Sequence, residues 1–173
     1  MKTLSPTLEA FDRMTSAEAM MAILPCNGSR AWAERMAAAR PFHSASELFA
    51  AADKVWWSLS PHDWQQAFDS HPRIGEKLAV HATKQSLDWS AAEQAAARPD
   101  EATQTALAAG NREYEHKFGR IFIVCATGRG AAEMLQILDR RLKNDPETEL
   151  KETAEQQRQI TQIRLRKWLG PLA

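Results

Sequence analysis

His71 is the residue whose type and position best suit proton transfer. It follows a helix-like stretch and lies in the segment SHPRIG at 70–75. Pro72 disfavours a helical backbone at His71, and Gly75 interrupts the run, so we expect the imidazole in a constrained turn. A histidine held at a helix end can act as an acid or a base near neutral pH. The alternative is that the segment only ends a helix, and the residues alone favour that structural role.

Glu93 and Arg164 are charged side chains with two readings each. Ser90 and Glu93 have the spacing of a capping box, in which Glu93 only supports a helix start. The same helix start, residues 90–94, would present free amides and a favourable dipole to an anion. Arg164 lies in an apolar stretch of a long helix, and it either extends to solvent or reaches a carboxylate in a pocket.

The backbone of residues 122–126 is a further candidate for ligand binding. These residues belong to the stretch 119–130, which resists helix formation and contains the one strand-like run of the sequence, 121–125. Their amides and carbonyls are not used by a helix. They could therefore bind a flat ligand that is rich in hydrogen-bonding groups.

Metal-ligand patterns are weak in this sequence. His71, Glu76 and His81 match no standard zinc spacing. Glu113-x-x-His116 is half of a di-iron motif, and the second half is absent. Since the two cysteines are also isolated, we predict no metal site.

Composition and charge bound the class of protein. The 173 residues suit one domain, 1–173, whose core needs no covalent staples. The 22 basic and 22 acidic residues cancel, which argues against a partner that is a nucleic acid or a membrane surface. The sequence has neither a long uncharged apolar run nor the apolar core of a signal peptide at its start. Cys26 and Cys125 form no disulfide framework, so we expect a cytoplasmic protein.

Residue frequencies favour an all-α fold. The chain has 30 alanines, the best helix formers, against 3 valines and 7 isoleucines, which favour strands. We predict a single-domain compact bundle of about eight helices and a short non-helical loop near 119–129. The helices are expected at 16–24, 30–39, 45–59, 61–70, 91–97, 101–118, 130–143 and 146–169, with a further short one at 6–13. Capping signals support these starts at Thr15, Ser29, Ser44, Ser60, Ser90 and Asp145.

Seven short motifs follow one another in the order of a known family. They are Trp32 with Arg40-Pro41-Phe42, His71-Pro72-Arg73-Ile74-Gly75, Ser90-x-x-Glu93-Gln94, Asn111-x-x-Tyr114 with Lys117-Phe118-Gly119, Phe122-Ile123-Val124-Cys125-Ala126, Arg141-Leu142-x-Asn144 and Ile163-Arg164-Leu165. On these motifs the chain resembles the decarboxylases of 2-oxo-4-hydroxy-4-carboxy-5-ureidoimidazoline (OHCU), which complete the route from urate to (S)-allantoin. The resemblance spans nearly the whole chain.

The resemblance implies an all-α enzyme that needs no cofactor and forms a homodimer. It places the catalytic histidine at His71. The implied substrate contacts are Pro72, Ser90, Ala91, Ala92, Glu93, Gln94, Phe122, Ile123, Val124, Cys125, Ala126 and Arg164. The chain departs from many members at Arg73, where they are acidic, and at Arg120-Ile121, where they have an aromatic residue and proline.

The chemistry that the resemblance implies needs few groups. The carboxylate of OHCU lies one carbon from a ring C=N, which takes up the electrons that CO2 leaves behind. His71 would then be the acid/base at the 4-hydroxyl, Glu93 would bind ring or ureido N–H groups, and Arg164 would bind a substrate oxygen. Amides of residues 122–126 would hold the ring carbonyl. The alternatives are a helical binding or regulatory module without catalysis, and a different ureide lyase or hydrolase.

Overall fold

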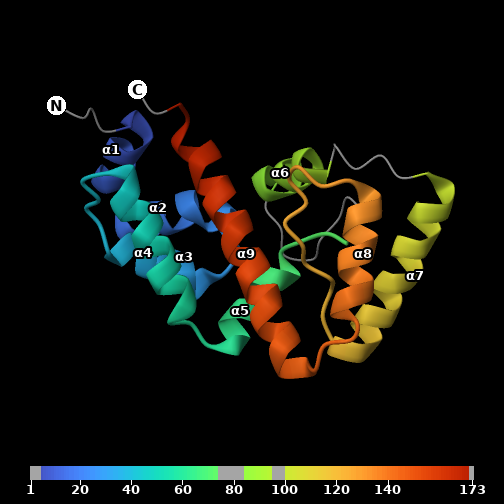
Figure 1. Cartoon of the computed structure of the whole chain (residues 1–173). Coiled ribbons are helices and arrows are strands. Elements are labelled where there is room, and N and C mark those ends of the chain that lie inside the picture. Colours follow the sequence, from blue (N-terminus) through green and yellow to red (C-terminus); the bar gives the residue numbers. More distant parts are fainter. Residues whose placement is uncertain (1–4, 74–83, 95–99, 172–173) are drawn as a thin grey trace. The chain divides into compact units, whose positions relative to one another are not determined.

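The architecture comes from a computed structural model that describes residues 5–73, 84–94 and 100–171. Within these residues the chain forms α-helices, one 3₁₀ turn and no strand, so the all-α prediction is confirmed (Figure 1). The elements are α1 (Pro6–Arg13), α2 (Ser16–Ile23), η1 (Leu24–Cys26), α3 (Arg30–Ala38), α4 (Ala45–Trp57), α5 (Pro61–Asp69), α6 (Lys84–Gln94), α7 (Glu101–Phe118), α8 (Ala131–Arg141) and α9 (Pro146–Leu169).

The chain divides into two compact units. Unit 1 comprises residues 1–67 and 158–173, and unit 2 comprises residues 68–157. Helix α9 therefore gives its first half to unit 2 and its second half to unit 1. Among the predicted site residues, His71, Glu93 and the loop 122–126 belong to unit 2, whereas Arg164 belongs to unit 1.

Side-chain caps begin helices α2 and α3 of unit 1 where the sequence predicts them. Thr15 and Glu18 form a complete capping box at the start of α2. The Ser29 hydroxyl accepts a hydrogen bond from the Trp32 amide at the start of α3. Trp32 is fully buried, and its indole N–H donates to the Ala52 carbonyl at 3.2 Å. The cap therefore starts α3, and the indole bond ties α3 to α4.

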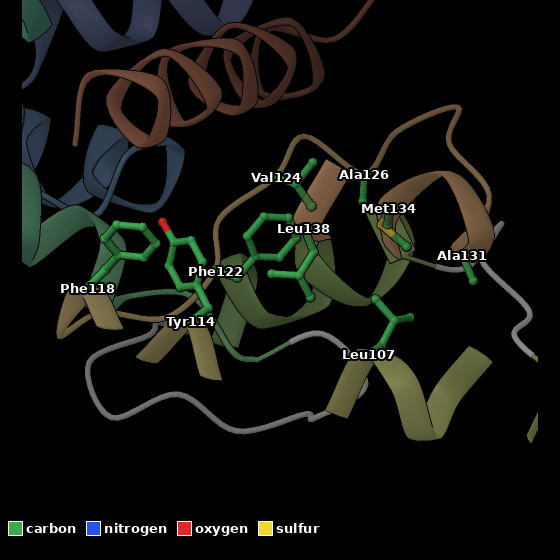
Figure 2. Close-up of a cluster of buried hydrophobic side chains, with 9 residues drawn as sticks. All are labelled: Leu107, Tyr114, Phe118, Phe122, Val124, Ala126, Ala131, Met134 and Leu138. Carbon is green, nitrogen blue, oxygen red and sulfur yellow. The ribbon is translucent and has the colours of Figure 1, made fainter. Parts of the chain in front are cut away.

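Unit 2 is built around α7 and α8, which run in the same direction (Figure 1). Two contacts show that the helices are parallel. Gly110 lies against Leu138, and Tyr114, further along α7, lies against Arg141, further along α8. The connecting loop 119–130 must therefore return along the helix pair. The buried cluster that joins the loop to the two helices is drawn in Figure 2; it consists of Leu107, Tyr114, Phe118, Phe122, Val124, Ala126, Ala131, Met134 and Leu138.

Helix α6 differs from the prediction. The spacing of Ser90 and Glu93 predicts a helix at 91–97, but α6 begins at Lys84 and contains both residues beyond its first turn. A separation of three residues also places two side chains on one face of a helix, so the pattern alone does not mark a start. The predicted end at 97 lies outside the described residues. The other described helix boundaries agree with prediction to within two residues.

Candidate functional site

The turn that carries His71 is built as the sequence predicts. Helix α5 ends at Asp69, and the His71 amide donates to the carbonyl of Phe68 at 3.1 Å. Pro72 follows directly and cannot continue a helix, because it lacks an N–H and its ring fixes its backbone. His71 is only 8% exposed, and Pro72 is buried. The imidazole therefore sits at a helix end on a constrained backbone, largely shielded from water.

Gln157 of α9 holds the imidazole ring. Its Oε1 lies 2.6 Å from Nε2 of His71, and the Gln157 side chain is fully buried. Both residues belong to unit 2. The sequence analysis did not find Gln157, because it lies among five other polar residues of α9 (EQQRQ at 155–159, and Thr153) that look alike without the fold.

The loop 121–126 has the alternation of an extended chain. The side chains of Phe122, Val124 and Ala126 point into the cluster with α7 and α8, whereas Ile123 and Cys125 are buried outside that cluster (Figure 2). A period of two is typical of an extended backbone. The strand-like run that the sequence indicates is therefore extended, yet it has no partner strand among the described residues.

One edge of this extended loop is bound by the protein itself. In an extended chain the polar backbone groups of residues i and i+2 point to the same edge. The Ile123 carbonyl accepts from Nη1 of Arg141 at 2.5 Å, and the Cys125 amide donates to Oε1 of Gln156 at 2.9 Å. Because Gln156 and Gln157 are neighbours on α9, one turn of this helix holds both the loop and His71.

The opposite edge of the loop carries backbone groups with no partner in the described part of the chain. They are the carbonyl of Phe122, both polar groups of Val124 and the amide of Ala126. These residues are 3–7% exposed. Buried backbone groups are nearly always hydrogen-bonded in folded proteins. This edge thus offers alternating donors and acceptors to a planar ligand with amide-like groups.

A buried ion pair supports the bound edge. Arg141 and Glu149 are both fully buried, and Nε of Arg141 donates to Oε1 of Glu149 at 2.8 Å. The hydroxyl of Tyr114 donates to the same carboxylate oxygen, and burial raises the pKa of Tyr114 to about 12. Asn144 donates to the other oxygen of Glu149 at 2.9 Å. Residues of two sequence motifs, Tyr114 from one and Arg141 and Asn144 from the other, therefore meet in one network that fixes the Ile123 carbonyl.

Helix α6 does not supply the anion site that the sequence predicts at residues 90–94. Ser90 is the seventh residue of α6, so its amide has a hydrogen-bond partner within the helix and is not an orphan of a helix start. The Ser90 side chain is 3% exposed, Glu93 is half-buried, and Ala91 and Ala92 are exposed. Contact of these residues and of Gln94 with a substrate stays a prediction.

Arg73, one of the departures from the resembled family, forms an ion pair within unit 2. Its Nη2 donates to Oε2 of Glu115 at 2.9 Å, and its Nε donates to the other carboxylate oxygen. Glu115 belongs to α7. The pair ties the segment after His71 to α7, and its half-exposed position keeps its energetic contribution small.

Arg164 does not extend to solvent. Its side chain is 1% exposed in the interior of unit 1, and its Nη1 donates to the carbonyl of Pro25 at 3.4 Å. The inward orientation that its apolar neighbours predict is thus confirmed. Its contact with a substrate stays a prediction.

Two absences hold for the described part of the chain. No group of three or more His, Cys, Asp or Glu side chains there could hold a metal ion. Of the residues weighed as ligands from the sequence, Glu76 and His81 lie outside that part. The described helices also include none with the length and apolar character needed to cross a membrane.

Comparison with known proteins gives one consistent result. The family model described as OHCU decarboxylase matches residues 12–166. The uric acid degradation bifunctional protein TTL of Arabidopsis thaliana is 37% identical over 145 residues, which are 82% of this chain and 44% of that protein. The chain thus spans less than half the length of this relative. The 2-oxo-4-hydroxy-4-carboxy-5-ureidoimidazoline decarboxylase of Haloferax volcanii is 26% identical over 136 residues, 77% of each chain.

A solved structure gives the same result. The crystal structure of an OHCU decarboxylase in the presence of (S)-allantoin superposes with a TM-score of 0.75 at 33% identity. The superposition covers 86% of this chain and 96% of that one. The similarity therefore includes both compact units.

Proposed function

Because this chain belongs to the OHCU decarboxylase family, we propose that it releases CO2 from OHCU and yields (S)-allantoin. The family model runs through both compact units, which supports a single functional domain over residues 1–173. The observation that carries the proposal is local to unit 2. Adjacent residues of α9 hold a shielded imidazole and an extended loop, and the second edge of this loop has no partner among the described residues.

The proposed reaction uses the substrate as its own electron sink. The bond between C4 and the carboxylate breaks, and the adjacent ring C=N takes up the electron pair. The ring nitrogen that receives the electron pair gains a proton from water. The 4-hydroxyl then loses its proton as a carbonyl forms, and C5 gains a proton on one face. Because the electrons stay within the ring, we propose that no cofactor or metal takes part. The protein has only to orient the carboxylate and to move protons.

His71 is the proposed acid/base at the 4-hydroxyl. Its burial and its bond to Gln157 keep the ring in one orientation, which a proton-transfer group requires. The backbone groups of Phe122, Val124 and Ala126 that have no partner in the described segments match the N–H and C=O groups of a ureide ring. Donors that are fixed before the reaction stabilise developing charge most effectively.

The remaining roles are proposed from the resemblance. Glu93 would bind ring or ureido N–H groups, and Arg164 would bind a substrate oxygen. Pro72, Ser90, Ala91, Ala92, Gln94, Ile123 and Cys125 would line the substrate. The homodimer and the cytoplasmic location are likewise proposals.

The test generates OHCU in situ from urate and follows optically active allantoin by circular dichroism. We expect the protein to accelerate formation of (S)-allantoin, with full activity in EDTA. His71→Asn should lower kcat by about 10²–10⁴-fold, the usual contribution of a positioned acid/base group. His62→Asn is the matched control, because His62 lies on α5 with a side chain 95% exposed. If the protein does not accelerate allantoin formation, a non-catalytic helical module is favoured. If His71→Asn keeps full activity, His71 only ends helix α5 and is not the acid/base.

A further inference from the structure

We propose that Gln157 is a positioning residue that fixes the ring of His71 with a proton on Nε2, and that this fixed ring is the one that exchanges protons with the substrate. The first part is a statement about the folded protein alone. The second part rests on the proposed function.

The tautomer follows from the chemistry of the two atoms in contact. Oε1 of Gln157 lies 2.6 Å from Nε2 of His71. An amide oxygen can only accept a hydrogen bond, so Nε2 must carry the hydrogen. A neutral imidazole has one N–H, and its other nitrogen is then a proton acceptor. The acceptor in His71 is therefore Nδ1.

The burial of this contact makes the tautomer costly to change. Gln157 is fully buried, and His71 is 8% exposed. Moving the proton to Nδ1 would bring the lone pair of Nε2 against the Gln157 oxygen. In a water-poor environment a lost hydrogen bond of this kind is not replaced by solvent.

The backbone on both sides of the contact is fixed independently. His71 is held by the hydrogen bond from its amide to Phe68 and by Pro72. Gln157 lies well inside the long helix α9. Its neighbour Gln156 accepts a hydrogen bond from the Cys125 amide at 2.9 Å. The same turn of α9 therefore fixes the position of the imidazole ring relative to the loop.

The tautomer can be observed by NMR of protein labelled with ¹⁵N-histidine, without reference to catalysis. We expect His71 to show an Nε2–H proton protected from exchange with water, assigned by its absence in His71→Asn. Gln157→Leu removes the acceptor at similar size and should abolish this signal. Gln157→Glu keeps an acceptor oxygen and should retain a proton on Nε2. Gln156→Leu removes the amide that binds Cys125, not His71, and should leave the signal unchanged.

Kinetics test the catalytic part. Gln157→Leu should lower kcat by about 10²-fold with little change in KM, because a misplaced catalytic group costs about that factor and the loop still binds the substrate. The matched control is Gln136→Leu, since Gln136 is an exposed glutamine of α8 and its variant should match the unmutated protein.

The outcomes separate the two proposals. An Nδ1–H tautomer in the unmutated protein, or an unchanged Nε2–H signal in Gln157→Leu, overturns the positioning role whether or not the protein decarboxylates OHCU. A protein with the expected signal but no activity would instead contradict the proposed function. If Gln157→Leu does not fold, loss of the Nε2–H signal in folded Gln157→Glu overturns the inference, and its retention supports it.

Discussion

A buried guanidinium needs acceptors, because removing an unpaired charge from water is costly. Arg164 is 1% exposed and donates to the carbonyl of Pro25. Burial raises the pKa of the nearby Cys26 thiol, and the positive charge of Arg164 opposes that rise. The positive charge of Arg164 therefore acts on groups inside unit 1 and not on solvent.

The planar fork of Arg164 leads to a first prediction. Arg164→Lys should weaken binding of (S)-allantoin by about 1–3 kcal/mol, the range for a charged hydrogen bond, and should not restore what Arg164→Ala loses. Titration calorimetry with (S)-allantoin measures both losses. Arg166→Lys is the control, because Arg166 is exposed on the same helix. Equal losses at both positions would indicate a general charge effect and remove Arg164 from the site.

The guanidinium of Arg120, unlike that of Arg164, has buried donors without acceptors in the described part of the chain. Its Nε and Nη1 are buried and have no hydrogen-bond partner in the described part of the chain. Since unpaired charged donors cost stability, Arg120→Met should raise the free energy of unfolding by about 1–3 kcal/mol in urea titrations. Arg112→Met, at an exposed position of α7, should change it little. A lower stability of Arg120→Met would mean that Arg120 contributes favourably to the fold.

At the scale of single elements, helix starts are predictable where a side chain reaches its own backbone. Oδ1 of Asp145 accepts from the Thr148 amide at 2.9 Å, and α9 begins at Pro146 as predicted. The pair Ser90 and Glu93 has similar spacing but lies inside α6, since the three-residue spacing occurs equally on a helix face. Local sequence therefore specifies the existence of a helix better than its first residue.

The parallel pair of α7 and α8 depends on a glycine. A Cβ at Gly110 would lie 2.6 Å from Cδ2 and 3.3 Å from Cγ of the fully buried Leu138. In an open helix Gly→Ala stabilises by about 1 kcal/mol. Here overpacking should outweigh that gain, and Gly110→Ala should lower the free energy of unfolding by about 1–3 kcal/mol.

A double variant checks the cause of this loss. Leu138→Ala removes the atoms that the new methyl group would meet. The cost of combining it with Gly110→Ala should be smaller than the sum of the two single costs, as for residues in direct contact. Additive costs, or a Gly110→Ala variant as stable as the unmutated protein, would contradict close packing at this point.

At the scale of the whole molecule, the prediction from sequence was accurate for fold class and for most helices, and it missed the residues that hold the candidate site in place. His71 and the extended loop could be found because proline, glycine and an apolar run mark them locally. Gln157 and Glu149 could not, because polar residues on α9 are equivalent until the fold buries some of them. Their partners, His71 and Tyr114, are 86 and 35 residues away in the chain.

The buried ion pair of Arg141 and Glu149 tests how far unit 2 depends on such distant contacts. Both side chains are fully buried, and Arg141 also fixes the Ile123 carbonyl. Removing one partner of a buried pair leaves an uncompensated charge, so Glu149→Gln should lower the free energy of unfolding by about 3–5 kcal/mol. Replacing both, by Arg141→Met with Glu149→Leu, should cost less than the two single changes together. Glu147→Gln, which breaks an exposed pair with Lys151, is the control and should leave the urea midpoint unchanged.

If Glu149→Gln unfolds at the same urea midpoint as Glu147→Gln, the buried pair does not stabilise unit 2. The double variant also lacks the bond from Arg141 to the Ile123 carbonyl. We therefore expect it to fold but to bind (S)-allantoin more weakly.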